Sequence, residues 1–234
     1  MTRTSTIILF CFNILLSSPF QPGEKLEYSA GFRLFSAGIA TLEITLDTLG
    51  MDSVFKIYAE TNTNSFFDRL YKVRDKVTAW MDPLNFELLK VDKKVSEGRY
   101  KRNHFATVNR GDSTIITSKN IKKIDAPVFD PISIVYLLRD KIKKITGMKE
   151  VYVYDLGKIR KVLFKITGQE KIRVPYGIFD CFIVEPVSRD NKPLLKNKGQ
   201  MKVWYSDDEL RLPVRIEQVT NIGTMVMELK SVSR

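Results

Sequence analysis

Beyond its first twenty residues, the sequence holds one histidine and one cysteine, His104 and Cys181. A zinc site of the usual kind takes several such ligands, so this inventory excludes one. No GxSxG motif and no phosphate-binding glycine loop occurs, which argues against triad hydrolases and nucleotide enzymes. We therefore expect no metal and no cofactor. His104 is predicted to be an ordinary strand histidine, and Cys181 a buried structural thiol that shares a strand face with Phe179 and Ile183.

The strongest candidates for catalysis are three adjacent acids, Asp207, Asp208 and Glu209. Neighbouring carboxylates can bind calcium or act as acid and base in glycoside hydrolysis. A Ser-Asp-Asp-Glu run between two strands is equally typical of a hairpin turn, in which the side-chain oxygens accept backbone N–H groups. We favour the turn and expect no catalytic residue and no enzymatic activity. The alternative is a hydrolase of envelope glycan or lipid that uses these acids.

Two short apolar segments carry the residues best suited to hold a hydrophobic ligand. Phe66, Phe67 and Leu70 recur at helix-like spacing in the first, and Tyr136 and Leu137 lie in the second. A curved sheet that closes over two short helices can leave an apolar groove between them. These five residues are predicted to line that groove. The alternative is that they simply fill a hydrophobic core.

Strands must position these residues, because the sequence is strand-like almost throughout. Apolar residues from Ala40 to Leu46 alternate with polar ones, which is the period of a strand with one buried face. The predicted strands are 28–34, 40–46, 54–60, 73–81, 86–95, 99–108, 113–118, 150–154, 158–167, 170–174, 179–187, 200–205, 212–220 and 224–232. Short turns such as 82–85 separate them, which is typical of an antiparallel meander rather than of alternating strands and helices.

Two segments interrupt the strands. Residues 64–71 have helix-like spacing for two turns, and 130–140 is the stronger helix, because Asp130 can cap it and Pro131 suits the first helical position. Both are too short to be stable alone, so they must pack on the sheet. The predicted fold is all-β with two short helices: a large curved antiparallel sheet, or an open or half barrel, with the helices on its concave side.

The N-terminal segment predicts export. Arg3 supplies a positive start, residues 7–16 are apolar, and Ser17 and Ser18 are small residues suited to a cleavage site. The apolar stretch is about half the length of a membrane-spanning helix. Residues 1–20 are thus predicted to be a signal peptide and 21–234 a single β-rich domain. An uncleaved interfacial anchor is the alternative, and the bulky residue before Cys11 argues against lipoprotein processing.

The net formal charge is +11, from 38 basic and 27 acidic residues. Such a balance suits anionic lipid headgroups, acidic polysaccharide or nucleic acid. Export argues against nucleic acid, although residues 100–105 mix cations with aromatic rings. An anionic envelope surface is therefore a predicted partner. The alternative is that the lysines only keep exposed β faces soluble.

Six phrases occur in a fixed order: GEKLEYSAGFRLFSAGIATLEI, FFDRLYKVRDKVTAWMDP, DPISIVYLLRD, VPYGIFDCFIVEP, KVWYSDDELRLPVRIE and GTMVMELKSV. Together they resemble the family called domain of unknown function 3108, over roughly residues 22–233. The resemblance implies a secreted, mainly β protein of Gram-negative bacteria with no assigned reaction. The layout is also similar to the half barrel of periplasmic lipoprotein carriers, but a shared architecture does not transmit function.

We predict a periplasmic or outer-membrane-associated protein that binds a hydrophobic or amphipathic ligand, such as a lipid or an acylated partner, without catalysis. Two alternatives stay open. One is the hydrolase that uses Asp207, Asp208 or Glu209, and the other is a structural module that binds anionic lipopolysaccharide.

Overall fold

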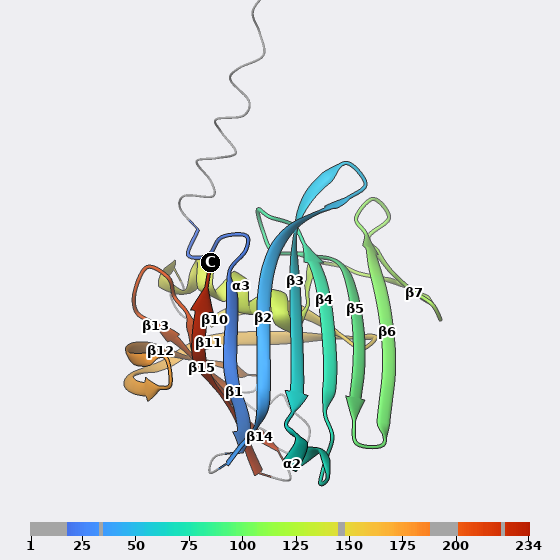
Figure 1. Ribbon diagram of the computed structural model, residues 1–234. Coiled ribbons are helices and arrows are strands. Elements are labelled where there is room, and N and C mark those ends of the chain that lie inside the picture. Colours follow the sequence, from blue (N-terminus) through green and yellow to red (C-terminus); the bar gives the residue numbers. More distant parts are fainter. Residues whose placement is uncertain (1–17, 33–34, 145–147, 188–200, 221–222) are drawn as a thin grey trace, which may run out of the picture.

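Fifteen strands form one sheet in the computed structural model, which describes residues 18–32, 35–144, 148–187, 201–220 and 223–234. The strand order is β8-β7-β6-β5-β4-β3-β2-β1-β15-β14-β13-β12-β11-β10-β9. Neighbouring strands are antiparallel, except that β9 pairs in parallel with β10 (Figure 1). Strands account for 68% of the residues and helices for 9%, which confirms the predicted all-β class and open sheet.

The elements alternate with short turns along the chain. The strands are β1 (Lys25–Phe32), β2 (Phe35–Leu49), β3 (Asp52–Thr63), β4 (Arg74–Met81), β5 (Leu88–Glu97), β6 (Tyr100–Asn109), β7 (Thr114–Thr117), β8 (Ile121–Lys123), β9 (Val128–Phe129), β10 (Met148–Asp155), β11 (Lys158–Val174), β12 (Gly177–Val187), β13 (Met201–Ser206), β14 (Pro213–Thr220) and β15 (Gly223–Ser233). The helices are α2 (Ser65–Asp68), α3 (Pro131–Lys141) and the 3-10 helix η1 (Ile142–Lys144). Gly50 and Gly98 have φ of 66° and 57° in the turns after β2 and β5, a conformation that glycine adopts without strain.

The alternation of β2 places its apolar residues inside the sheet. Ala40, Leu42 and Ile44 are buried, whereas the polar residues between them are partly exposed. Ile44 pairs with Ile57 of β3, and Leu42 pairs with Leu26 of β1. These side chains belong to one large core cluster that also includes residues of α3. The predicted two-residue period therefore sets which face of the sheet forms the core.

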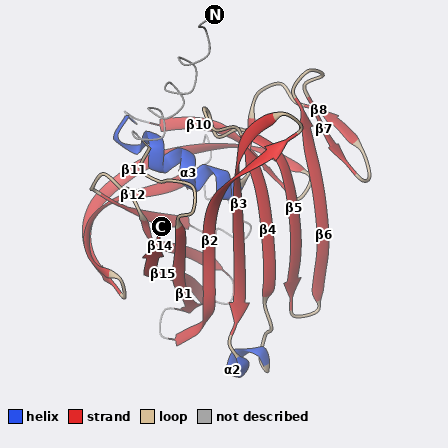
Figure 2. Cartoon of the chain, turned by 45° about the horizontal axis from the view of Figure 1, so that its top comes forward, coloured by secondary structure: helices blue, strands red, loops and turns tan. Residues whose placement is uncertain are grey.

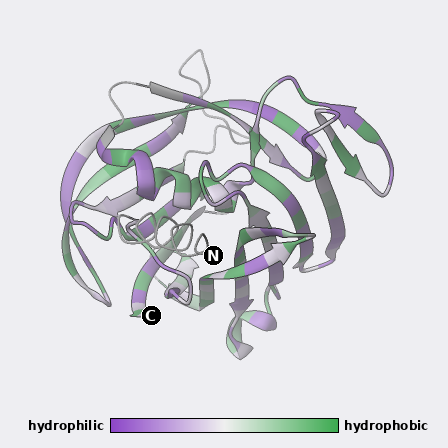
Figure 3. Ribbon diagram, turned by 90° about the horizontal axis from the view of Figure 1, so that it is seen from above, coloured by the Kyte–Doolittle hydropathy of each residue, from purple (hydrophilic) through white to green (hydrophobic). Residues whose placement is uncertain are grey.

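The sheet curves around α3, as the view along the strands shows (Figure 3). Asp130 caps this helix, because its Oδ1 accepts the N–H of Ile132 at 3.0 Å and its own N–H donates to Ser133 Oγ at 2.9 Å. Pro131 takes the first helical position as predicted. Tyr136 and Leu137 are among the residues that α3 buries in the core.

The second helix, α2, has a different position. It is a single turn in the connection between β3 and β4, capped by Asn64, and buries none of its residues. Figure 2 shows it at the end of the sheet opposite α3. The predicted helix of two turns is thus shorter than expected, and only α3 lies within the curve of the sheet.

The two ends of the sheet approach each other without pairing. Val128 and Tyr154, on β9 and β10, share a small buried cluster with Val91, Ala106 and Ile115 of β5, β6 and β7. Side chains of β6 and β8 also bind the hairpin between β10 and β11. Its backbone accepts hydrogen bonds from Arg102 to Leu156 O at 2.9 Å and from Lys122 to Gly157 O at 2.7 Å.

The strand predictions differ from the structure mainly in the second half. The predicted strands 158–167 and 170–174 are one strand of 17 residues, β11, with an irregular register between Ile166 and Gly168. The short strands β8 and β9 were not predicted. The predicted signal segment lies mostly outside the described residues. Within the described ranges, no helix has the length and apolarity needed to traverse a bilayer.

Candidate functional site

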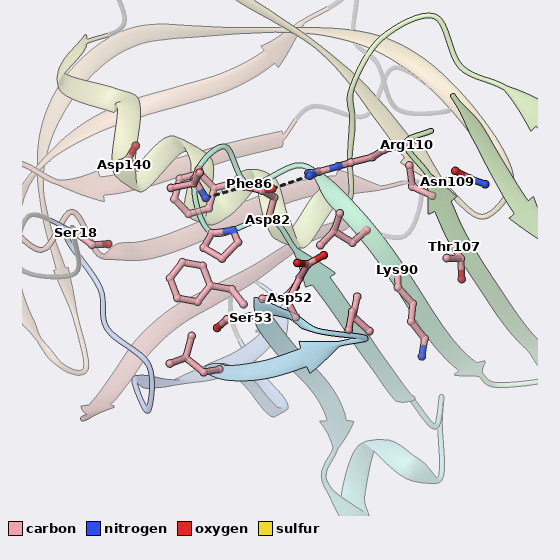
Figure 4. Close-up of a pocket in the computed structure, with 18 of the residues that line it drawn as sticks. Ser18, Asp52, Ser53, Asp82, Phe86, Lys90, Thr107, Asn109, Arg110 and Asp140 are labelled. Carbon is pink, nitrogen blue, oxygen red and sulfur yellow. Dashed lines mark hydrogen bonds and ion pairs between the residues drawn. The ribbon is translucent and has the colours of Figure 1, made fainter. Parts of the chain in front are cut away.

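A hollow lies at the end of the sheet opposite α2. It has a volume of about 1310 Å³ and is bounded by the β2–β3 hairpin, the β4–β5 connection, the β6–β7 turn and the C-terminal end of α3 (Figure 4). Its surface is mainly apolar, and half of its lining residues are apolar: Leu46, Leu49, Val54, Phe55, Pro83, Leu84, Phe86, Leu89, Val108 and Ile116. Its charged lining residues are Asp52, Asp82, Lys90, Arg110, Asp140 and Lys141. A concave, mainly apolar surface with a few charged groups is the usual form of a small-ligand site.

The β4–β5 connection builds the centre of this hollow. Asp82 Oδ1 accepts the N–H groups of Leu84 at 2.8 Å and Asn85 at 3.3 Å, which closes a tight turn. Phe86 then adopts a left-handed conformation with φ of 64° and donates its N–H to Asp82 O at 3.0 Å. This conformation is costly for an aromatic residue and must be stabilised by its surroundings. It directs the ring of Phe86 inward, where 4% of the residue is exposed.

Aromatic rings form the floor. Phe86 stacks on Phe55 with ring centroids 6.4 Å apart, and Phe20 meets both rings edge-on at 5.8 and 6.0 Å. Phe20 also contacts Tyr136 of α3 at 4.8 Å. Such aromatic pairs stabilise a fold by more than the burial of their apolar area alone would provide. All three rings belong to the main core cluster, and Phe55 and Phe86 also line the hollow. This floor was not predicted, because nothing local in the sequence signals that Phe20, Phe55 and Phe86 converge.

The charged side of the hollow is held by ion pairs. Arg110 binds Asp82 at 2.8 Å and Glu87 at 3.2 Å, and so links the β6–β7 turn to the β4–β5 connection. Burial alone would raise the pKa of Asp82, but the hydrogen bonds from Arg110 and from the N–H of Leu84 outweigh it and lower that pKa. Lys90 lies 4.5 Å from the ring of Trp80 on the outer face of the sheet.

A buried ion cluster anchors α3 beneath the hollow. The guanidinium of Arg139 contacts both carboxylate oxygens of Glu24, and neither side chain is exposed. Arg139 Nη2 also donates to Pro19 O at 3.1 Å and to Leu210 O at 3.0 Å. Arg234, at the end of the chain, binds Glu24 at 3.0 Å. The segment before β1, the end of α3 and the residue after β15 thus meet at one cluster of three charges.

A second charged cluster joins the two ends of the sheet. Lys93 Nζ lies 2.7 Å from Asp130 Oδ2, at the start of α3, and 2.7 Å from Asp155 Oδ1, at the end of β10. Burial lowers the pKa of Lys93, but the two carboxylates outweigh it and raise that pKa. Beside them, His104 Nε2 is 2.8 Å from Tyr154 Oη. We call the contacts of Lys93 and His104 with α3 and β10 the seam.

The structure does not bring the five predicted ligand-binding residues together. Tyr136 and Leu137 are buried in the core on α3, and burial raises the pKa of Tyr136. Phe66 and Leu70 are 65% and 72% exposed, at the opposite end of the sheet. Phe67 packs edge-on against Phe66 at 5.4 Å. None of the five is among the residues that line the hollow, so their role in binding stays a prediction.

The acids at 207–209 form a turn, as favoured from the sequence. Asp208 Oδ1 accepts hydrogen bonds from Ser206 Oγ at 2.8 Å and from the N–H groups of Leu210 and Arg211, both at 2.9 Å. Asp207 donates its N–H to Asp180 O at 2.7 Å, and its carboxylate lies 3.5 Å from Lys143. All three acids are exposed and lie outside the hollow. Asp208 therefore closes a loop rather than facing a ligand.

The single thiol of the described residues is buried, as predicted. Cys181 is 1% exposed within the main core cluster, and burial, assisted by Asp180, raises its pKa to about 12. A thiol with so high a pKa is a poor nucleophile. Among the residues that the structure describes, no three histidine, cysteine or acidic side chains converge as metal ligands would.

The sequence places this fold in a family. A family model described as protein of unknown function (DUF3108) matches residues 27–230. The chain is a DUF3108 protein. The resemblance identified from six ordered phrases is thereby confirmed. Among curated proteins, a search found no match.

Solved structures share the architecture of this DUF3108 protein at low sequence identity. A β-barrel-like protein of domain of unknown function DUF1849 from Brucella abortus has 9% identity and a TM-score of 0.56, over 90% of this chain and 96% of that one. A Bacteroides fragilis protein with a YmcC-like fold, provisionally described as exported, has 12% identity and a TM-score of 0.35, over 93% and 98% of the two chains. A Parabacteroides distasonis protein, provisionally described as a lipoprotein, has 14% identity and a TM-score of 0.34, over 92% and 97%. The first of these establishes a shared barrel-like fold.

Proposed function

We propose that this DUF3108 protein is an exported envelope protein that binds a hydrophobic or amphipathic ligand, a lipid or an acylated partner, without acting on it chemically. One observation carries the proposal: the hollow of about 1310 Å³ at the end of the sheet, with its apolar walls and charged margin. Ligand pockets usually measure roughly 300–1000 Å³. A hollow of this size accommodates an acyl chain together with a polar headgroup.

The arrangement of the lining suits an amphipathic molecule. Phe55 and Phe86 form an apolar floor, and Leu46 and Leu84 stand at the margin with 51% and 70% of their surfaces exposed. Large apolar side chains that remain exposed around a concave surface are typical of binding sites. Arg110 and Lys141 also line the hollow, each paired with an acid of the same lining, Asp82 and Asp140, and their remaining N–H groups can donate to a polar headgroup.

The test begins with protein purified from its own envelope and examined by native mass spectrometry. We expect a bound species that lipid extraction removes. The fluorescent fatty acid cis-parinaric acid serves as a defined probe for the delipidated protein. A clean apo mass together with no binding of the probe contradicts the proposal.

Two variants on the same hairpin localise the site. Leu46→Asp places an unpaired charge against the apolar wall and is expected to weaken probe binding by about tenfold or more. Met51→Asp, at the fully exposed tip outside the lining, is the matched control and should bind as the wild type does. If both variants bind equally well, the hollow is not the site.

A further inference from the structure

A second surface of unusual composition lies at the end of the sheet opposite the hollow. It consists of the tip of the β3–β4 connection, which contains α2, and the tip of the β5–β6 hairpin (Figure 1). Four large apolar or aromatic residues stand out from it, and four cations lie between them. We call this set the α2 surface: Phe66, Leu70, Tyr71, Tyr100, Arg69, Lys72, Arg99 and Lys101.

The apolar members of the α2 surface are exposed to an unusual degree. Phe66 is 65% exposed and Leu70 72%, while Tyr71 and Tyr100 are each 48% exposed. Single exposed apolar residues are normal, but a cluster of them on one surface marks an interaction site. Phe35, 66% exposed at the start of β2, lies at the same end of the sheet.

Hydrogen bonds hold these residues in place. Asn64 Oδ1 accepts the N–H groups of Phe66 at 3.1 Å and Phe67 at 3.0 Å, which caps α2. Asp68 binds Arg74 at 2.5 Å, and hydrogen bonds from Arg74 and Thr63 lower the pKa of Asp68. The exposed rings are therefore held on a rigid turn, so little conformational entropy is lost when they bind a partner.

The two tips are also joined to each other. Gly98 donates its N–H to Lys72 O at 2.8 Å, and Val73 pairs with Glu97 in an isolated bridge. The ring of Tyr71 lies so close to Gly98 that a Cβ there would come within 2.8 Å of it. The α2 surface is thus one continuous unit built from two connections.

The charges of this unit are unbalanced. Over residues 64–75 and 96–101, five cations face three acids. Asp68 is paired with Arg74, and Asp75 accepts the N–H of Ser96 at 2.8 Å. Within the described ranges, no acid lies at ion-pair distance from the four cations of the α2 surface. These cations are exposed and remain available to an external anion.

We propose that the α2 surface docks the protein onto the surface of an anionic phospholipid bilayer. Tyrosine and phenylalanine favour the boundary between headgroups and acyl chains, and neighbouring cations are attracted to anionic headgroups. A second copy of the chain is a poor occupant, because a symmetric contact would set the same cations against each other. The proposal is independent of the ligand in the hollow.

The experiment uses the full domain and vesicles separated by flotation. We expect binding to vesicles that contain phosphatidylglycerol, weaker binding to pure phosphatidylcholine, and release as salt concentration rises. Arg69→Gln/Arg99→Gln should lose roughly 25-fold in affinity for the anionic vesicles, since each cation at such a surface contributes about fivefold. Phe66→Ser/Leu70→Ser should lose about tenfold or more on the same vesicles.

Matched controls come from exposed apolar residues elsewhere. Met51→Ser/Ile121→Ser removes two side chains that are 101% and 67% exposed but lie outside the α2 surface, and should bind as the wild type does. Leu46→Asp, designed to impair the hollow, should also still bind vesicles, so the two proposals can fail separately. Unchanged thermal unfolding shows that each variant is folded. Equal binding to neutral vesicles, wild-type binding by either α2-surface variant, or retention by envelope proteins without vesicle binding overturns the proposal.

Discussion

At the scale of single residues, side chains that suggest chemistry have structural roles. Asp208 lies in an acidic run that resembles a catalytic pair, yet one of its oxygens accepts three hydrogen bonds within its own loop. This arrangement satisfies backbone donors that would otherwise lack partners. Cys181 is likewise buried in the main core cluster. Asp208 therefore serves to close its loop, and all three acids of this run lie outside the hollow.

Replacing Asp208 tests this conclusion. Asp208→Ala should cost about 0.5–2 kcal/mol of unfolding free energy through the lost hydrogen bonds, and Asp208→Asn should cost less because Oδ1 remains as an acceptor. Glu209→Ala, at the exposed neighbouring position, is the control and should be near neutral. Urea unfolding measures the difference. A loss of probe binding in Asp208→Asn at unchanged stability would contradict a purely structural role.

At the scale of elements, α3 depends on its two ends for its position. Its N-terminus is fixed by Asp130, which caps the helix and approaches Lys93. Its C-terminus is fixed by Arg139, whose side chain is fully buried against Glu24. A helix of eleven residues is marginal alone, so these anchors and the apolar face determine where it lies. The contact of Arg139 with Glu24 therefore also fixes the position of the C-terminal end of α3, which borders the hollow.

We therefore expect Arg139 to be a major contributor to stability. Arg139→Leu leaves Glu24 buried with a single remaining cation, and should cost about 3–5 kcal/mol of unfolding free energy. The double variant Arg139→Leu/Glu24→Leu should recover part of this loss, because the charge that then loses its partner, Arg234, is partly exposed to solvent. Lys141→Met, on the same helix but partly exposed, should change little. If Arg139→Leu is no worse than Lys141→Met in urea unfolding, the buried pair does not anchor α3.

At the scale of the whole molecule, the fold is an open sheet whose two ends are held together by side chains. β1 and β15, the first and last strands of the described chain, pair with each other in the middle of the sheet. The seam of Lys93 and His104 joins β5 and β6 to β10, and a small apolar cluster joins β4–β7 to β9 and β10. Side-chain contacts of this kind cover part of the edges that an open sheet would otherwise expose.

The seam predicts a dependence of stability on pH. Burial, then Arg102 and Lys93, lower the pKa of His104 below its usual 6.5. The unfolded chain then binds the proton more tightly than the folded one, so stability falls as the pH drops below 6.5 toward the folded pKa. His104→Gln should reduce this loss when unfolding is measured at pH 7.5 and 5.5. Because the chain has one histidine, NMR titration reports its pKa directly, and a value above 6.5 would contradict the prediction.

Local patterns in the sequence determined much of the fold. The capping of α3 by Asp130 and the turn at Asp208 were predicted correctly, and so was the alternation of β2 from Ala40 to Ile44, whereas Leu46 at the end of the predicted strand is exposed. Each depends on residues within a few positions of one another, where periodicity and side-chain-to-backbone hydrogen bonds act. The burial of Cys181 follows from the same two-residue period.

Only the tertiary structure decided which distant residues meet. Glu24 and Arg139 are 115 positions apart, and Lys93 and Asp155 are 62 apart. Their contacts depend on strand order and on the curvature of the whole sheet, which no local pattern encodes. For the same reason, the apolar residues of α2 and α3 were predicted to share one groove although they lie at opposite ends of the sheet. The hollow arises where three connections converge on a left-handed Phe86, a conformation set by packing rather than by residue type.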